Sequence, residues 1–264
     1  MISLKMQVKI LTVFMVCCLL IPSTSYAYGW GYKKGPKNQP PEVGKYGEIL
    51  KKHGGYYLDD SGEKTVYLTF DNGYEAGYTE TILDILQEEN VPATFFLTGH
   101  YVRSAPEIVK RIASDGHIIG NHSYHHYDFT ELTKEKYLKE VTDLDRAIEA
   151  VTGIERLHYL RPPRGVFNEQ TIEWGNEFGY IHMFWSVAFV DWHSDQNKGW
   201  ESAYRQVIDQ MHPGAIILLH TVTEDNALAL SHLIKDLKQE GYEFRSLDDL
   251  VLRDMIKDPL AIAK

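Results

Sequence analysis

The sequence predicts an α/β fold, a barrel of about seven parallel strands covered by helices. Seven short apolar runs suited to buried strands recur from residue 66 onward, and most are separated by stretches with apolar residues at helical spacing. Alternation of strand and helix is typical of parallel strands joined by crossover helices. No Gly-x-Gly-x-x-Gly follows the first strand, so nothing supports a dinucleotide-binding fold.

The predicted elements follow one another in a regular order. The helix that begins near Pro106 should end before Gly116, because proline suits a first helical turn and glycine a helix end. Gly153 and Gly241 follow two further helices in the same way. The strands are expected at 66–70, 93–97, 117–120, 158–161, 182–188, 215–219 and 242–245, and the helices near 43–52, 78–86, 106–116, 133–151, 168–178, 201–211 and 226–239.

The first 27 residues have the features of an export signal. Lys5 and Lys9 give a basic start, residues 10–21 form an apolar stretch, and Ala27 ends a small-residue site that a signal peptidase would cleave. The apolar stretch is shorter than the roughly 20 residues that span a membrane. We expect cleavage after Ala27 and no stable membrane span afterwards; an uncleaved anchor is the alternative.

The remaining chain divides into three parts. Residues 28–63 are rich in Gly, Pro, Lys and Tyr and have no sustained period, which predicts an extended N-terminal arm. The alternating strands and helices occupy residues 64–254, and residues 255–264 form a C-terminal tail.

Charge and cysteine content exclude several classes of protein. The formal net charge is −10, and loss of Lys5 and Lys9 with the signal makes it −12. Such a charge argues against nucleic acid or an anionic membrane as a partner. Cys17 and Cys18 both lie in the signal, so the mature chain has neither a disulfide framework nor a catalytic thiol.

Reactive side chains follow the strand ends. In a parallel barrel these ends form one face, where catalytic residues gather. One such residue is weak support, but several that are far apart in the sequence and converge on one face are strong support. They are Asp71 after the first strand, Asn121, His122 and His126 after the third, Arg161 at the end of the fourth, Asp191, Trp192 and His193 after the fifth, and His220 at the end of the sixth.

Each of these residues also has an ordinary structural interpretation. His122 and His126 are four residues apart, so on one helical turn they can face a metal ion, but a surface or core pair is equally expected. His125 competes as a ligand. His220 suits a general acid or base, or a buried hydrogen-bonded histidine.

The remaining motifs are similarly open. Residues 161–165, Arg-Pro-Pro-Arg-Gly, form a rigid turn or supply Arg161 to hold an acid ionised. Asp191 and Trp192 suit a helix cap and a packed ring, or an acid that orients a histidine beside an aromatic wall.

Taken in order, these pieces resemble the motif series of the polysaccharide deacetylases, carbohydrate esterase family 4, whose conserved unit is the NodB homology domain. The resemblance covers residues 64 to about 250. It implies a distorted (β/α) barrel that removes acetyl groups from N-acetylated sugars with the help of a metal.

The resemblance implies a role for each residue. Asp71 would be the general base, paired with Arg161. His220 would be the general acid, tuned by Asp191. Trp192 would line the acetyl pocket.

His122 and His126 would bind a divalent ion, Zn²⁺ or a similar one. Asn72 stands where the family normally has an aspartate ligand, so a neutral carbonyl oxygen replaces an anion and the metal should bind more weakly. Arg164 stands where the family often has tyrosine, and its backbone N–H would bind the oxyanion.

One branch of the family is more similar still: the spore-cortex deacetylases of N-acetylmuramic acid, which lead to muramic δ-lactam. The stretches TFDNGYE, GHIIGNHS, YLRPPRGVF, FWSVAFVDW and HPGAIILLHTV resemble that branch, and Asn72 is characteristic of it. The implied partner is peptide-stripped peptidoglycan glycan, acted on by an exported monomer on the cell-wall or spore-cortex side of the membrane.

Three alternatives stay open. In the first, the protein is a deacetylase whose substrate is another N-acetylated polysaccharide such as a chitin-like glycan, or a xylan ester. In the second, the chain is a catalytically inactive secreted sugar-binding module, in which Asn72 marks loss of the metal. In the third, it is a glycosidase that uses the carboxylates Asp71 and Asp191, although the histidines would then have no role.

Overall fold

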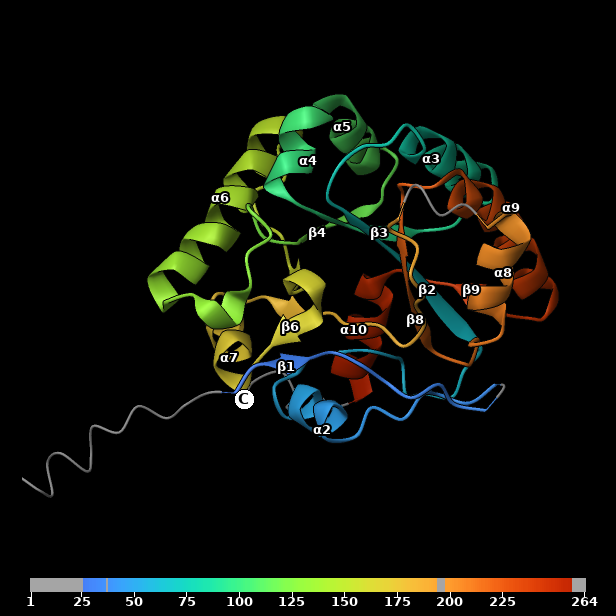
Figure 1. The fold of residues 1–264 in the computed structure, drawn as a ribbon, viewed down its shortest axis with the longest axis horizontal. Helices are drawn as coiled ribbons and strands as arrows, with labels where there is room; N and C mark the ends of the chain where they lie inside the picture. Colours follow the sequence, from blue (N-terminus) through green and yellow to red (C-terminus); the bar gives the residue numbers. More distant parts are fainter. Residues whose placement is uncertain (1–25, 37, 194–197, 258–264) are drawn as a thin grey trace, which may run out of the picture.

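The structure is a computed structural model that describes residues 26–36, 38–193 and 198–257 (Figure 1). The expected signal up to residue 25 lies outside this part of the chain. Within these residues, no helix has both the length and the apolar character needed to cross a bilayer.

The predicted barrel is present. Six strands pair in the order β7-β5-β4-β3-β2-β8, β9 pairs with β2, and every pairing is parallel. Each of the seven predicted strands has a counterpart, although the one expected over 182–188 is regular only at its start. They are β2 (Thr65–Asn72), β3 (Ala93–Leu97), β4 (Ile118–Asn121), β5 (Tyr159–Leu160), β7 (Ile181–His182), β8 (Ala215–His220) and β9 (Glu243–Phe244).

The barrel is closed irregularly by the segment after β7. The sequence predicts one strand over 182–188, but regular pairing covers only Ile181–His182. Beyond it, the Met183 N–H donates to the Leu160 carbonyl on one side at 2.9 Å, and the Ser186 N–H donates to the Ile216 carbonyl on the other at 3.0 Å. This segment therefore joins β5 to β8 through isolated bonds, which makes the barrel distorted.

Helices cover the outside of the sheet (Figure 1). The seven predicted helices are present as α2 (Lys45–Lys52), α3 (Thr79–Glu88), α5 (Pro106–Ser114), α6 (Lys134–Thr152), α7 (Glu169–Glu177), α8 (Trp200–Ile208) and α9 (Glu224–Gln239). Two more were not predicted, α4 (Gly99–Ser104) and α10 (Leu247–Lys257). Helix α10 crosses residue 254, where the sequence places the end of the domain.

The two faces of β2 separate the packing core from the site. Val66, Leu68 and Phe70 join the main core between the sheet and the outer helices. Tyr67 belongs instead to a second apolar cluster, in which α10 packs against the barrel interior. Because side chains alternate along a strand, Asp71 lies on the same inward face as Tyr67, at the carboxyl end of β2.

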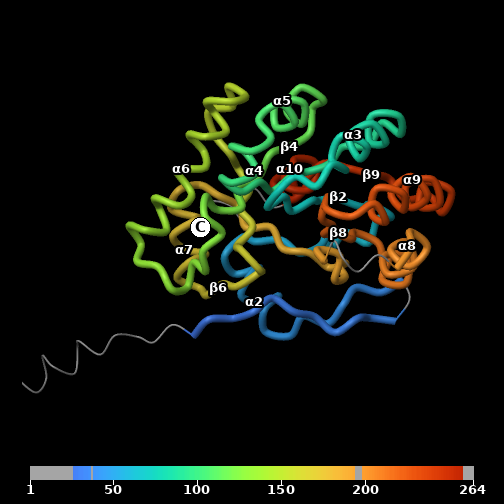
Figure 2. Tube along the Cα trace, turned by 45° about the horizontal axis from the view of Figure 1, so that its top comes forward, coloured from blue at the N-terminus to red at the C-terminus, as the bar shows by residue number. Residues whose placement is uncertain are grey.

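The N-terminal arm runs along one side of the molecule, in blue in Figure 2. Its strand β1 (Tyr28–Gly29) pairs antiparallel with β6 (Val166–Phe167). The Trp30 indole N–H donates to the Trp185 carbonyl at 3.0 Å, so the arm contacts the segment that closes the barrel.

Candidate active site

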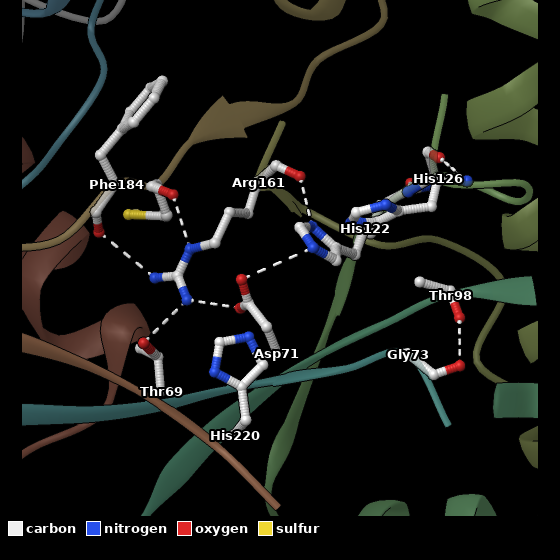
Figure 3. Close-up of polar contacts among 12 residues, drawn as sticks. Thr69, Asp71, Gly73, Thr98, His122, His126, Arg161, Phe184 and His220 are labelled. Carbon is white, nitrogen blue, oxygen red and sulfur yellow. Dashed lines mark hydrogen bonds and ion pairs between the residues drawn. The ribbon is translucent and has the colours of Figure 1, made fainter. Parts of the chain in front are cut away.

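Asp71 and Arg161 form a buried ion pair at the carboxyl ends of β2 and β5 (Figure 3). Arg161 Nη1 lies 2.7 Å from Asp71 Oδ1, and the two residues are 0% and 6% exposed. The guanidinium also donates to Thr69 Oγ1 and to the carbonyls of Met183 and Phe184. All three guanidinium nitrogens of Arg161 are therefore hydrogen-bonded, which holds the guanidinium in one orientation toward Asp71.

The ion pair keeps Asp71 ionised. Burial alone would raise the pKa of the Asp71 carboxyl, but Arg161, with smaller contributions from His122 and His220, brings that pKa below its ordinary value. A buried carboxylate near neutral pH can accept a proton only if its partner leaves one oxygen accessible. Arg161 bonds to Oδ1, whereas the other oxygen, Asp71 Oδ2, lies 3.5 Å from His122 Nε2.

His220, at the end of β8, is held by Asp191. Its ring Nδ1 lies 2.7 Å from Asp191 Oδ1, and its backbone N–H donates to Oδ2 at 2.8 Å. Burial would lower the pKa of His220, but the Asp191 carboxylate outweighs burial and raises it. Nδ1 is therefore the donor to Asp191, and Nε2 is the nitrogen free to exchange a proton with a substrate.

Asn226 is a site residue that the sequence analysis missed. Its Nδ2 donates to Asp191 Oδ2 at 2.6 Å and to the His220 carbonyl at 2.9 Å. It lies in the first turn of α9, whose N-cap is Thr223. Only this position, just after the strand that carries His220, would have marked it as a candidate.

His122 and His126 come together on a loop, so the expectation of a helical turn was wrong. Their ring centroids are 4.9 Å apart. Ser123 and His126 have φ of 67° and 62°, a left-handed conformation that coils the loop without helical bonding. The His126 N–H donates to Ser123 Oγ at 2.7 Å, which fixes the turn.

Both imidazoles are prepared to act as neutral ligands. His122 Nδ1 donates to the Arg161 carbonyl at 2.7 Å, which leaves Nε2 as the free nitrogen, an orientation common for metal-binding histidines. Burial lowers the pKa of His122. Loss of hydration and the neighbouring His122 lower the pKa of His126 to about 4.

Two other polar residues of this region serve the scaffold. His125 Nδ1 lies 2.7 Å from Glu140 Oε1, so its ring is bound there and does not compete as a ligand. Asn121 donates to the Val141 carbonyl at 2.9 Å and accepts from the Ser123 N–H at 2.9 Å. It shapes the histidine loop from behind.

Asn72 is the third candidate donor for a cation. Its Nδ2 donates to Thr221 Oγ1 at 2.7 Å, while its buried Oδ1 has no partner in the described chain. Two imidazole nitrogens and one amide oxygen fit a divalent ion such as Zn²⁺. Among the described residues, no group of three His, Cys, Asp or Glu side chains could hold a metal.

Arg164 and Trp192 are both exposed. Arg164 has φ 57° and ψ 11°, and its exposed guanidinium is 3.0 Å from Asp128 Oδ2. The Trp192 ring, 48% exposed, lies edge-on to His220 with centroids 5.6 Å apart. Two further aromatic residues, Tyr74 and Tyr127, are exposed. Tyr74 lies two residues after Asn72, and Tyr127 directly follows His126.

Figure 3 shows His122, Arg161 and His220 around the Asp71 carboxylate, with His126 beside His122. His193, which the sequence grouped with Asp191, instead packs beside Trp192, with ring centroids 5.8 Å apart. Asp191 and Trp192 join the group around Asp71 through His220. Asn72 directly follows Asp71 in β2 and bonds to Thr221, and Arg164 lies in the turn Pro163–Gly165 and pairs with Asp128.

Comparison with known proteins points to one family. A sequence model described as polysaccharide deacetylase matches residues 59–182. The chain is 48% identical to the peptidoglycan-N-acetylmuramic acid deacetylase PdaA of Bacillus subtilis, over 87% of this chain and 88% of that protein. It is 50% identical to an uncharacterised 30.6 kDa protein of Geobacillus stearothermophilus, over 92% of each.

Solved structures agree. That of Bacillus subtilis PdaA, described as a family 4 carbohydrate esterase, matches with a TM-score of 0.84 and 47% identity, and the match covers 86% of this chain and 98% of that one. The shared fold therefore includes the whole barrel and not only the matched motifs.

Proposed function

The chain belongs to the polysaccharide deacetylase family, a family of amide hydrolases, and we propose that it removes the acetyl group from N-acetylmuramic acid in peptidoglycan. The observation that carries the proposal is that two ionisable side chains at one end of the barrel have pKa values shifted in opposite directions. Asp71 has a lowered pKa and His220 a raised one, which are the states that a base and an acid need before reaction.

We assign the base to Asp71. Arg161 binds Oδ1, so Oδ2 faces the reacting water and accepts its proton as the oxygen attacks the acetyl carbon. The Arg164 backbone N–H donates to the oxyanion that develops on the carbonyl oxygen.

We assign the acid to His220. Its Nε2 proton passes to the sugar nitrogen as the carbon–nitrogen bond breaks, which gives acetate and a free amine. Asp191 holds the ring in the tautomer with its proton on Nδ1 and stabilises the positive charge before transfer. Trp192 walls the acetyl pocket beside this ring.

His122, His126 and Asn72 would hold a divalent cation. When bound, the cation supplies Lewis-acid polarisation of the acetyl carbonyl and acidifies water. Since Asn72 contributes no charge, we expect the affinity to be lower than with aspartate at this position.

The substrate assignment rests on the similarity to PdaA and on the mouth of the site. N-acetylmuramic acid carries a lactyl carboxylate, which is free once the stem peptide has been removed. The exposed Arg164 guanidinium is a suitable partner for a carboxylate. Tyr74, Tyr127 and Trp192 are exposed at the same end and suit stacking on neighbouring sugar rings.

Two alternatives are separable. A glycosidase needs a protonated carboxylic acid, whereas Asp71 is bound by Arg161 and Asp191 by His220 and Asn226. An inactive sugar-binding module is favoured only by Asn72. Incubation of wild type and Asp71→Asn with peptide-stripped glycan distinguishes it, because an enzyme loses acetate release and a binding module releases none in either form.

We also propose the setting of the reaction. Export directed by residues 1–27 would bring the protein to the cell wall as a monomer. Its arm would cover residues 28–63 and its deacetylase domain residues 64–254. There, action on spore cortex after removal of the stem peptide would lead to muramic δ-lactam. Detection of δ-lactam in cortex from cells with and without the gene tests this assignment.

A further inference from the structure

Behind Asn72, away from the inner face of the barrel, lies a chain of hydrogen bonds that ends at Glu75. The Glu75 Oε2 atom accepts from the hydroxyls of Thr79 and Tyr101, each at 2.6 Å. Oε1 accepts from the Gly77 N–H at 2.6 Å. Thr79 and Tyr101 are completely buried, and neither takes part in the mechanism above.

The chain continues to Asn72 through Thr221. The Thr221 hydroxyl oxygen lies 2.9 Å from Thr79 Oγ1 and 2.7 Å from Asn72 Nδ2. The Asn72 side chain also lowers the pKa of the Tyr101 phenol, although burial dominates and raises that pKa overall.

The direction of every hydrogen in this chain follows from the charge on Glu75. Burial alone would raise the pKa of Glu75, but its bonds from Thr79, Tyr101 and the backbone lower it, so the carboxylate can only accept. Thr79 and Tyr101 therefore direct their hydrogens to Glu75. Thr221 has Thr79 Oγ1 as the acceptor for its own hydrogen, which leaves the Thr221 oxygen as an acceptor toward Asn72.

An acceptor at Thr221 requires a donor at Asn72. The amide nitrogen must face Thr221, because the opposite amide orientation would set two acceptors against each other. The amide oxygen is then turned away from the chain, and Oδ1 is buried without a partner in the described structure.

We propose that Glu75 is a positioning residue, which orders the hydrogens of Tyr101, Thr79 and Thr221 so that Asn72 presents its amide oxygen to the ligand site. One part of this inference rests on the proposed function, namely that the ligand of the Asn72 amide oxygen is a cation beside His122 and His126. An aspartate at position 72 would not need this arrangement, because its carboxylate would accept the Thr221 hydrogen. The dependence on Glu75 is therefore specific to asparagine.

The test compares Glu75→Gln with Glu80→Gln in the intact protein. Glu80 is exposed in the first turn of α3, five residues after Glu75, so it is the matched control. A glutamine amide at position 75 can donate hydrogen bonds as well as accept them. The hydroxyls of Thr79 and Tyr101 then no longer have to direct their hydrogens to residue 75. The readouts are hydrogen exchange of the Asn72 side-chain NH₂, assigned in the ¹H–¹⁵N spectrum by its loss in Asn72→Asp, and Zn²⁺ affinity by calorimetry.

We expect the Asn72 NH₂ to be protected in wild type and Glu80→Gln and to lose protection in Glu75→Gln. Zn²⁺ affinity should fall by about tenfold, the effect typical of removing a group that orients a ligand. Thr221→Val removes the acceptor directly and should give the same loss of protection if Glu75→Gln does not fold.

An unchanged NH₂ signal in both variants would overturn the proposal. So would an equal loss of Zn²⁺ affinity on changing Glu75→Gln in the Asn72→Asp background, because Glu75 would then act only through general stability. If wild type releases no acetate but the NH₂ signals change as expected, the proposed function is wrong and the positioning role of Glu75 is still supported.

Discussion

The carboxylate of Asp191 contacts His220 through both of its oxygens, one on ring Nδ1 at 2.7 Å and the other on the backbone N–H at 2.8 Å. This two-point contact fixes the position of the histidine as well as its tautomer. Asn226 binds the same carboxylate from its other side at 2.6 Å, so the acid is itself held in place.

The first prediction concerns Asp191→Asn. The carboxylate raises the pKa of His220, so His220 stays protonated to a higher pH than the ordinary value of about 6.5. Removing the charge should lower that pKa and move the basic limb of the kcat profile to lower pH. We expect kcat at neutral pH to fall by about 10²- to 10⁴-fold, as for loss of an acid–base contribution.

Asn226→Ala is the milder counterpart. It removes one bond to Asp191 but keeps the charge, so the basic limb should stay near its wild-type pH while kcat decreases. A basic limb that is unchanged in Asp191→Asn would contradict His220 as the acid.

The second prediction concerns the stability of the ion pair. Asp71→Asn leaves the fully buried Arg161 without a counter-charge, which typically costs about 3–5 kcal/mol. The folded pKa of Asp71 is lowered, so its stabilising contribution is present above the unfolded value of about 3.9 and is lost as pH falls through the folded value.

Denaturant unfolding should therefore show a large difference between wild type and Asp71→Asn at pH 7, and a smaller one at acid pH below the ordinary range of a carboxyl. A difference that grows on acidification would show that Asp71 is not ionised in the folded protein.

The third prediction concerns Asn72→Asp. Replacing the amide oxygen with a carboxylate adds a charge to the donor set of His122 and His126 and should tighten binding of Zn²⁺ in calorimetry. His122→Ala in the same background should reverse the gain. If affinity does not change in Asn72→Asp, residue 72 is not a ligand.

The fourth prediction concerns Arg164→Gln. The backbone N–H remains, whereas the guanidinium charge is lost, which pairs with Asp128 in the structure and which we propose meets the lactyl carboxylate. KM for peptide-stripped muramic substrate should rise by about tenfold, since a charge-assisted bond contributes about 1.5–3 kcal/mol, with kcat almost unchanged. Activity on an N-acetylglucosamine oligomer, which lacks the carboxylate, is the control; an equal rise in KM there would exclude carboxylate recognition.

Much of the fold could be predicted from local sequence. Strands β2, β3 and β8 are rich in apolar residues because they are buried on both faces. Helix α4 was missed because it has only six residues and begins at a glycine. Helix α10 was missed although Leu247, Leu250 and Val251 have helical spacing; only these three of its residues are buried.

The site was predictable in its members more than in its geometry. A spacing of four residues is the same on a helix and on a loop, so the His122–His126 pair alone could not show that left-handed residues coil the chain. The contacts of Asn226 and Glu75 depend on which helices pack beside β2 and β8, and no local pattern encodes that packing.

The most direct test of the account is acetate release from glycan strands by wild type and Asp71→Asn, with peptide-stripped and intact strands in parallel and with Zn²⁺ or chelator added. We predict acetate from stripped strands with wild type alone, lost with chelator and restored by Zn²⁺. Acetate release by Asp71→Asn at the wild-type rate, or none from wild type under any condition while the strands still bind, would contradict the assignment of this barrel end as a deacetylase site.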